Sequence, residues 1–173
     1  ISEMWALVHQ QLYNAGEAML TGDKELAYKV ISRERRVNAF ELKIDSDCED
    51  IIALYAPVAI DLRFVLAMYK INTNLERLGD FAESIARFAG NLPEGEPIDP
   101  QLVKETRVEE MLSELLSMIS LTKEAFEKES SEIASRIFLK DNLIDEINHN
   151  STAIIAKYIE EHKGSALAGL YMA

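Results

Sequence analysis

The chain has 173 residues, of which 48% are hydrophobic, and carries a net charge of -12. This is enough apolar sequence for one or two small domains with a buried core. The acidic charge argues against nucleic acid or anionic lipid as a direct partner, because both bind basic surfaces. The only cysteine, Cys48, excludes an internal disulfide and suits a reducing cytoplasm.

The first predicted helix covers about residues 2–20, where apolar side chains recur every three or four positions. Gly22 fits the C-cap that ends this helix, and Asp23 fits the N-cap of the next one. The second predicted helix begins near Lys24 and continues towards Tyr55. We expect Ala56-Pro57 to end it, because proline disfavours the helical state in the residue before it.

The third predicted helix runs from about residue 59 to Gly90 and contains the string Leu75-Glu-Arg-Leu-Gly-Asp80. Glu76 and Asp80 are four residues apart, so they lie one above the other on one helix face. Such like-charged pairs cost a few tenths of a kcal/mol, and Gly79 between them costs about 1 kcal/mol relative to alanine. A missing side chain at Gly79 would let a neighbouring backbone or a ligand come close.

Residues 91–100 contain three prolines and one glycine and are predicted to form a stiff, extended linker. The helical pattern then restarts. A fourth helix is predicted over about residues 108–126, a fifth over about 132–161, and the start of a sixth over 166–173.

The same order, a helix, a short break, a long helix, a short break and another helix, therefore occurs twice. We predict an all-α fold of two tandem three-helix bundles. Residues 1–90 form the first repeat, 91–100 the linker and 101–173 the second repeat. The chain stops inside an apolar run, so we expect the second repeat to be incomplete and the chain to be part of a longer protein.

Acidic residues on the second helix are predicted to face those on the third. Helices joined by a short turn face each other at equal distances from that turn, which places Glu76 and Asp80 opposite Glu34, with Glu41 two turns along. Carboxylates gathered at one level suit a hard or borderline metal ion. The same reflection places Asp45 near Lys70.

Nearer the turn, the reflection places Asp50 beside Arg63 as an ordinary ion pair. The alternative to a metal site is a solvated acidic face with local partners, such as the pair Glu83 and Arg87, which are four residues apart.

The predicted fifth helix repeats the acidic spacing. Asp141 and Asp145 are four residues apart, and His149 continues their stripe by one turn. Glu146 and His149 form a single Glu-x-x-His. The alternative for Asp141 is an ion pair with the adjacent Lys140.

Several of these strings resemble the PhoU family. The Asp61-Leu-Arg63 string, Lys70 and the Leu-Glu-Arg-x-Gly-Asp motif are similar to the characteristic third helix of that family. The strings Glu34-Arg-Arg-Val-Asn38 and Glu41-Leu-Lys-Ile-Asp45 resemble its long second helix. Asp141-Asn-Leu-Ile-Asp145 resembles the counterpart in the second repeat, and the string from Ser165 to Ala173 resembles the opening of the sixth helix. The resemblance covers essentially the whole chain.

The resemblance implies two three-helix repeats that bind multinuclear metal clusters through paired acidic motifs. It carries Glu76 and Asp80 over as ligands of the first repeat, and Glu41 and Asp45 also fit the motif. By the reflection argument, Glu34 and Glu41 rank ahead of Asp45.

For the second repeat the resemblance carries over Asp141 and Asp145, although the second Glu-Arg-x-Gly-Asp motif is absent from the chain. Iron and zinc rank first among the metals. Manganese, magnesium and calcium remain open, because carboxylate sites accept all of them.

The resemblance also implies a cytoplasmic negative regulator of phosphate homeostasis that links a phosphate-importing ABC transporter to a sensor histidine kinase. A homo-oligomer is expected, and protein partners would bring it to the membrane. No catalytic constellation or glycine-rich phosphate loop is present, so we predict that the chain is not an enzyme.

Two alternatives remain. One is a cytoplasmic domain of a sodium–phosphate carrier. The other is a ferritin-like di-metal enzyme, which would need a second Glu-x-x-His motif.

Overall fold

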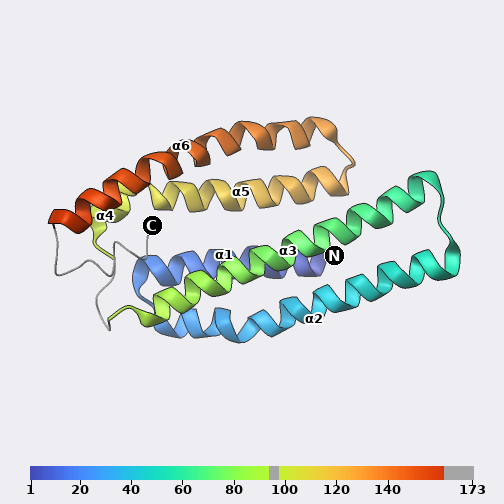
Figure 1. Ribbon diagram of the computed structural model, residues 1–173, viewed down its shortest axis with the longest axis horizontal. Coiled ribbons are helices and arrows are strands. Elements are labelled where there is room, and N and C mark those ends of the chain that lie inside the picture. Colours follow the sequence, from blue (N-terminus) through green and yellow to red (C-terminus); the bar gives the residue numbers. More distant parts are fainter. Residues whose placement is uncertain (94–97, 162–173) are drawn as a thin grey trace.

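The computed structural model describes residues 1–93 and 98–161, and all regular elements in these ranges are α-helices (Figure 1). Two helical hairpins lie side by side, and α1 lies between them. The helices are α1 (Ser2–Thr21), α2 (Lys24–Tyr55), α3 (Ala59–Asn91), α4 (Pro100–Thr106), α5 (Val108–Glu127) and α6 (Ser131–Glu161). The prediction of an all-α fold is confirmed. The predicted sixth helix, residues 166–173, lies outside the described residues.

Helices α1 and α2 are bounded by the residues that the sequence predicts for their ends. Gly22 has a φ of 71° after the last residue of α1. The Asp23 carboxylate accepts a hydrogen bond of 2.9 Å from the Leu26 amide, which satisfies one free donor at the start of α2. Ala56 is left-handed, with a φ of 43°, and ends α2 before Pro57. These local signals set the lengths of α1 and α2.

The α2–α3 hairpin is closely packed at Gly79, which is buried in the middle of α3. A Cβ atom added at Gly79 would lie 2.9 Å from the Cγ1 atom of Val37 on α2, closer than such contacts normally come. The neighbour that comes close is therefore the side chain of Val37. From the sequence we expected a backbone segment or a ligand at this place, and the structure has a side chain there instead.

Helix α1 joins the two hairpins. Its buried face packs on α2 and α3, while Gly16 on its other side leaves room for the Leu112 side chain of α5. The Trp5 indole donates a hydrogen bond of 3.1 Å to the Ile119 carbonyl of α5. The Phe126 ring stacks against Trp5 and against Phe64 of α3, with ring centroids 6.1 and 5.9 Å apart. The α5–α6 hairpin is thus attached to the first three helices mainly through α1, and Phe64 of α3 adds a direct contact.

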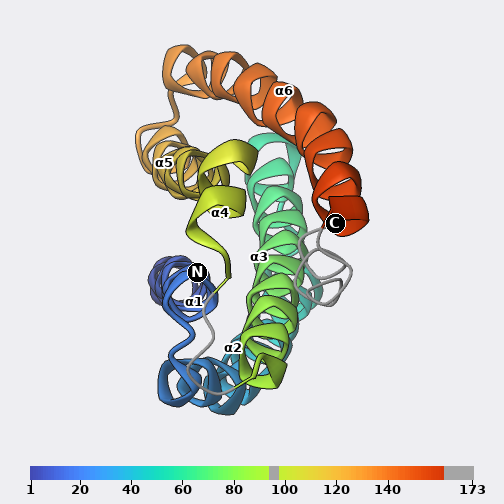
Figure 2. The ribbon, with the colours of Figure 1, turned by 90° about the vertical axis from the view of Figure 1, so that its left-hand side faces the viewer.

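The short helix α4 was not predicted. Asp99 caps it by accepting a hydrogen bond of 2.8 Å from the Gln101 amide, and Pro100 occupies its first turn. Leu102 of α4 is buried in a small second core with Ile98 and with Ile155 of α6. Figure 2 shows α4 between α5 and α6 at this end of the molecule.

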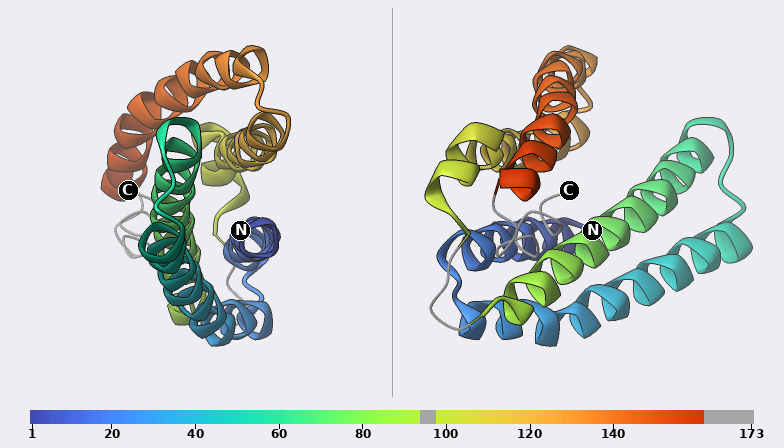
Figure 3. Two further views of the ribbon diagram at one scale, coloured as in Figure 1. Left: turned by 90° about the vertical axis from the view of Figure 1, so that its right-hand side faces the viewer. Right: turned by 60° about the vertical axis from the view of Figure 1, so that its left-hand side comes forward.

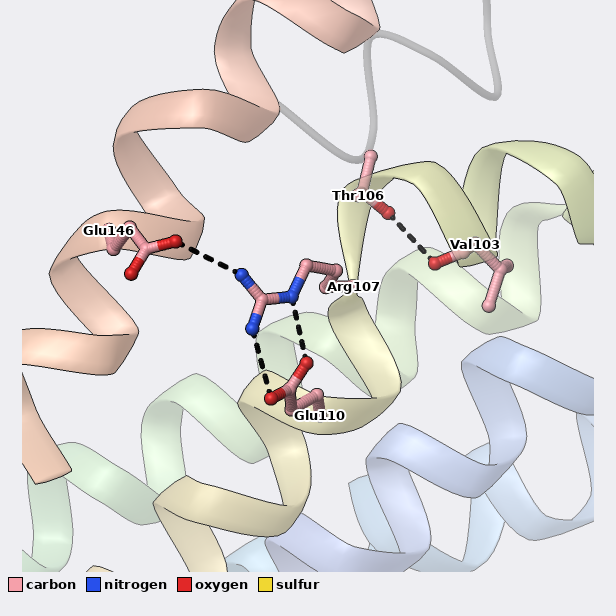
Figure 4. Close-up of polar contacts among 5 residues, drawn as sticks. All are labelled: Val103, Thr106, Arg107, Glu110 and Glu146. Atoms are coloured by element: carbon pink, nitrogen blue, oxygen red, sulfur yellow. Dashed lines mark hydrogen bonds and ion pairs between the residues drawn. The ribbon is translucent and has the colours of Figure 1, made fainter.

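Arg107 forms the junction between α4 and α5 and has a φ of 55°. Its guanidinium donates hydrogen bonds of 2.8 and 3.0 Å to the carboxylate of Glu110, one turn along α5. It also donates one of 3.2 Å to Glu146 of α6, as Figure 4 shows. This exposed network links the α4–α5 junction to α6.

Replacing Gly79 with leucine should reduce the free energy of unfolding by about 1–3 kcal/mol, because the new side chain would overpack against Val37. The matched control is Gly90→Leu in the same helix, where an added Cβ atom meets nothing within 4 Å. Urea unfolding of both variants measures the difference. Equal stability of the two would contradict the close approach of α2 and α3.

Candidate metal centre

The acidic residues predicted to form a site lie along facing stretches of the α2–α3 hairpin, and we call the group Glu34, Glu41, Glu76 and Asp80 the acidic level. Glu34 and Glu41 come from α2, and Glu76 and Asp80 come from α3. The helices hold these residues on the side next to the Gly79–Val37 contact. Glu34 is buried, Glu41 and Glu76 are half-buried, and Asp80 is exposed. Glu76 of α3 lies close enough to Glu41 and Glu34 of α2 for their charges to act on it across the hairpin.

Glu34 is the most deeply placed of these acids, with 9% of its surface exposed. Burial raises the pKa of its carboxyl above the ordinary value, and repulsion from Glu83 and Asp80 raises that pKa further. The amide of Asn38 offsets part of the shift. The Oε1 atom of Glu34 is buried without a hydrogen-bond partner within the described part of the chain. A buried acceptor in this state is costly unless a proton or a cation satisfies it.

Glu76 is held among other carboxylates. Burial raises the pKa of its carboxyl, and repulsion from Asp80, Glu41 and Glu34 adds to the shift. A hydrogen bond with Asp80 acts in the same direction. The Glu83 carboxylate at the edge of the group is engaged by Arg87 at 2.6 Å, so this predicted pair is confirmed. The neighbouring carboxylates thus help to raise the pKa of Glu34 and that of Glu76.

Asp45 has a different partner from the one predicted. Its Oδ1 atom accepts a hydrogen bond of 2.7 Å from the amide of Asn72, which also donates one of 2.9 Å to the Glu41 carbonyl. Asn72 is fully buried in α3, so it fixes Asp45 near the end of the acidic level. The predicted ion pairs of Asp45 with Lys70 and of Asp50 with Arg63 do not form in the described residues, 1–93 and 98–161.

The acids of α6 are more open. Asp141 and Asp145 are both exposed, as is His149. Lys140 bonds to Glu114 of α5 at 2.6 Å, which makes the suggested pairing of Lys140 with Asp141 wrong. Glu146 is engaged by Arg107, so the single Glu-x-x-His motif is occupied by a structural ion pair. This disfavours the ferritin-like alternative.

Two polar residues with clear structural roles were missed at the level of sequence. Asn72 lies on the apolar stripe of α3, where its buried amide could have been recognised as a hydrogen-bonding group. Arg107 is followed three residues later by Glu110, a spacing that favours an ion pair on a helix. Its contact with Glu146 joins distant segments and has no local signal.

The acidic level suits a cation by the chemistry of its donors. All four groups are carboxylates, which hold hard and borderline metals through oxygen, and Glu34 has an unsatisfied buried oxygen. In the side-chain positions of this structure, however, no group of three or more His, Cys, Asp or Glu among the described residues is gathered closely enough to hold a metal ion. Metal binding by Glu34, Glu41, Asp45, Glu76, Asp80, Asp141 and Asp145 therefore stays a prediction.

Comparison with known proteins places the chain in a family. The sequence pattern of the PhoU domain matches residues 1–89. The phosphate-specific transport system accessory protein PhoU homolog of Aquifex aeolicus is 34% identical over 163 residues, which cover 93% of this chain and 71% of that protein. The chain belongs to the PhoU family.

Other members of the PhoU family support this assignment. The Escherichia coli phosphate-specific transport system accessory protein PhoU is 34% identical over 146 residues, covering 84% of this chain and 59% of that protein. The crystal structure of PhoU from Pseudomonas aeruginosa is similar, with a TM-score of 0.91 and 28% identity, and the match covers 98% of this chain and 79% of that one. PhoU family proteins are regulatory accessory proteins and not enzymes, which confirms the prediction that this chain is not an enzyme.

Among the described residues, none of the helices combines the length and apolar character needed to cross a bilayer.

The metal-free chain should become less stable as the pH rises through the raised pKa values of Glu34 and Glu76. Their contribution to stability is fully present below the ordinary pKa of 4.5 and is lost above the folded-state value. Glu76→Gln should therefore raise the free energy of unfolding at pH 7 by a few tenths of a kcal/mol and flatten its dependence on pH.

Urea unfolding at pH 5 and pH 7 in the presence of a chelator measures this effect. Glu49→Gln is the control, because Glu49 is an exposed acid of α2. A loss of stability at pH 7 in Glu76→Gln would show that the acids do not repel one another.

Proposed function

We propose that this PhoU-family chain is a cytoplasmic regulatory protein of a phosphate transport system and a negative regulator of phosphate uptake and of phosphate-starvation signalling. The observation that carries the proposal is its similarity to proteins named as accessory and regulatory proteins of phosphate transport, which extends over almost its whole length. The partners are a phosphate-importing ABC transporter and a sensor histidine kinase, and the protein acts as a homo-oligomer.

We further propose that the acidic level of the α2–α3 hairpin binds metal ions, with iron or zinc ahead of manganese, magnesium and calcium. Glu34, Glu41, Glu76 and Asp80 would hold them, and Asp45 lies at the edge of the level. The support is the repulsion among these acids and the unpartnered Glu34 oxygen. A bound cation would supply the positive charge that the level lacks. The chain's own part is to hold the carboxylates on facing stretches of two helices.

Asp141 and Asp145 of α6 are proposed as ligands of a second site. They are exposed and four residues apart, which is the spacing of Glu76 and Asp80 on α3. Within residues 98–161 these two carboxylates form no ion pair, because Lys140 pairs with Glu114 and Arg107 pairs with Glu110 and Glu146.

Metal binding should be weakened at least about tenfold in the variant Glu76→Ala with Asp80→Ala, while circular dichroism shows an intact helical fold. Calorimetric titration with zinc(II), and with iron(II) under anaerobic conditions, measures the affinity. Asp47→Ala with Asp50→Ala is the matched control, because both acids are exposed on α2 away from the acidic level. A double variant that is only more stable, with unchanged metal affinity, would favour a solvated acidic face.

Deletion of the gene should leave phosphate-starvation genes switched on in phosphate-rich medium, because the repressing input to the kinase is lost. Transcript levels and phosphate uptake measure the effect, and expression of the whole gene from a plasmid should restore repression. Normal repression in the deletion strain, with unchanged uptake, would refute the regulatory role.

A further inference from the structure

The turn between α2 and α3 is surrounded by apolar side chains that face solvent. We call this group the apolar tip. The four side chains nearest the turn, those of Leu54, Tyr55, Val58 and Ile60, are 73–77% exposed. The apolar tip consists of Ile51, Ile52, Leu54, Tyr55, Val58 and Ile60.

The apolar tip contributes nothing to the core. Cys48 is the last buried side chain of α2 before the turn, and Val65 is the first buried side chain of α3 after it. Beyond them the hairpin extends past α1 and past the α5–α6 hairpin, as Figures 1 and 3 show. Contiguous exposed apolar surface of this kind marks an interaction site more often than it serves the fold.

The other hairpin provides an internal comparison. The turn between α5 and α6 lies at the same end of the molecule as the apolar tip (Figure 1). It is formed by Glu127, Lys128, Glu129 and Ser130, and it is followed by Ser131 and Glu132. A helical hairpin in this chain can therefore end in polar residues, and the apolar tip is a specific property of the α2–α3 turn.

The charges around the apolar tip indicate what it binds. Glu49, Asp50 and Asp61 flank it and are exposed, and Arg63 is the one basic residue between positions 49 and 63. This acidic collar repels anionic lipid. It also disfavours a second copy of a chain whose net charge is -12, because two collars would meet. A partner with a basic rim is complementary to it.

The chain's own described end does not reach the apolar tip. Helix α6 ends at Glu161, at the opposite end of the molecule from the α2–α3 turn (Figure 1).

We infer that the apolar tip of the α2–α3 hairpin docks into an apolar cleft with a basic rim on the cytoplasmic side of the phosphate ABC transporter. The inference rests on the proposed function for the identity of the partner, and on the exposed side chains and their acidic collar for the surface. Apolar side chains of a helix end enter the cleft, and Glu49, Asp50 and Asp61 meet the basic rim.

The test measures binding of the purified full chain to the phosphate transporter of the same organism, reconstituted in nanodiscs of zwitterionic lipid. In the tip variant, Leu54→Ser, Tyr55→Ser, Val58→Ser and Ile60→Ser are combined, and binding should weaken about tenfold or more. Its thermal melting should stay close to that of the parent, because none of the four side chains is buried.

The matched control is Phe138→Ser with Leu139→Ser, which removes two apolar side chains of α6 that are 72% and 73% exposed but lie away from the tip. This variant should bind as the parent does. In a third variant, Glu49→Lys with Asp50→Lys, the association rate should fall and its dependence on salt should weaken.

Other outcomes overturn the inference. Equal binding by the tip variant and the parent would place the interface elsewhere. Binding of the parent to empty nanodiscs, lost in the tip variant, would make lipid the occupant. A parent dimer in light scattering that the tip variant abolishes would make a second copy the occupant. If the parent does not bind the transporter but the deletion strain loses repression, the docking surface is refuted and the regulatory function stands.

Discussion

The arrangement of this molecule depends on the burial of α1 from two sides. One face of α1 fills the groove of the α2–α3 hairpin, and the opposite side meets α5. Gly16 is needed for this second contact, because the Leu112 side chain occupies the place of its missing Cβ atom. A hairpin of two helices has only a marginal core of its own, so α1 supplies the apolar surface on which both hairpins are fixed.

The α2–α3 interface combines tight packing with repelling charges. Val37 packs into the space left by Gly79, and Glu34 and Glu76 lie beside this contact. Close packing limits how far the helices can move apart, so the carboxylates remain near one another at neutral pH. A protein that needed only a stable bundle would be more stable with neutral residues there. The arrangement therefore lowers the stability of the metal-free protein, and the metal binding proposed above would give a reason for that cost.

Much of the fold could be predicted from sequence because its signals are local. Apolar periodicity and the caps at Gly22 and Asp23 depend on neighbouring residues, and they place the limits of α1 and α2 within a residue or two. Helix α4 is too short to show a period, although Asp99 before a proline was a usable signal. The facing of Glu76 and Glu34 follows from helix geometry. The bond from Asn72 to Asp45 depends on side-chain orientation, which sequence spacing does not determine.

The single tryptophan lies where the two hairpins meet. Trp5 is buried in α1, and its indole is bonded to α5 and stacked on Phe126. Its fluorescence therefore comes from one place, the seam between the halves, and depends on whether that seam is dry. Any event that separates the α5–α6 hairpin from α1 would move the emission to longer wavelength, even if every helix stayed intact. The protein thus carries an intrinsic optical reporter of its internal docking, independent of its helical content.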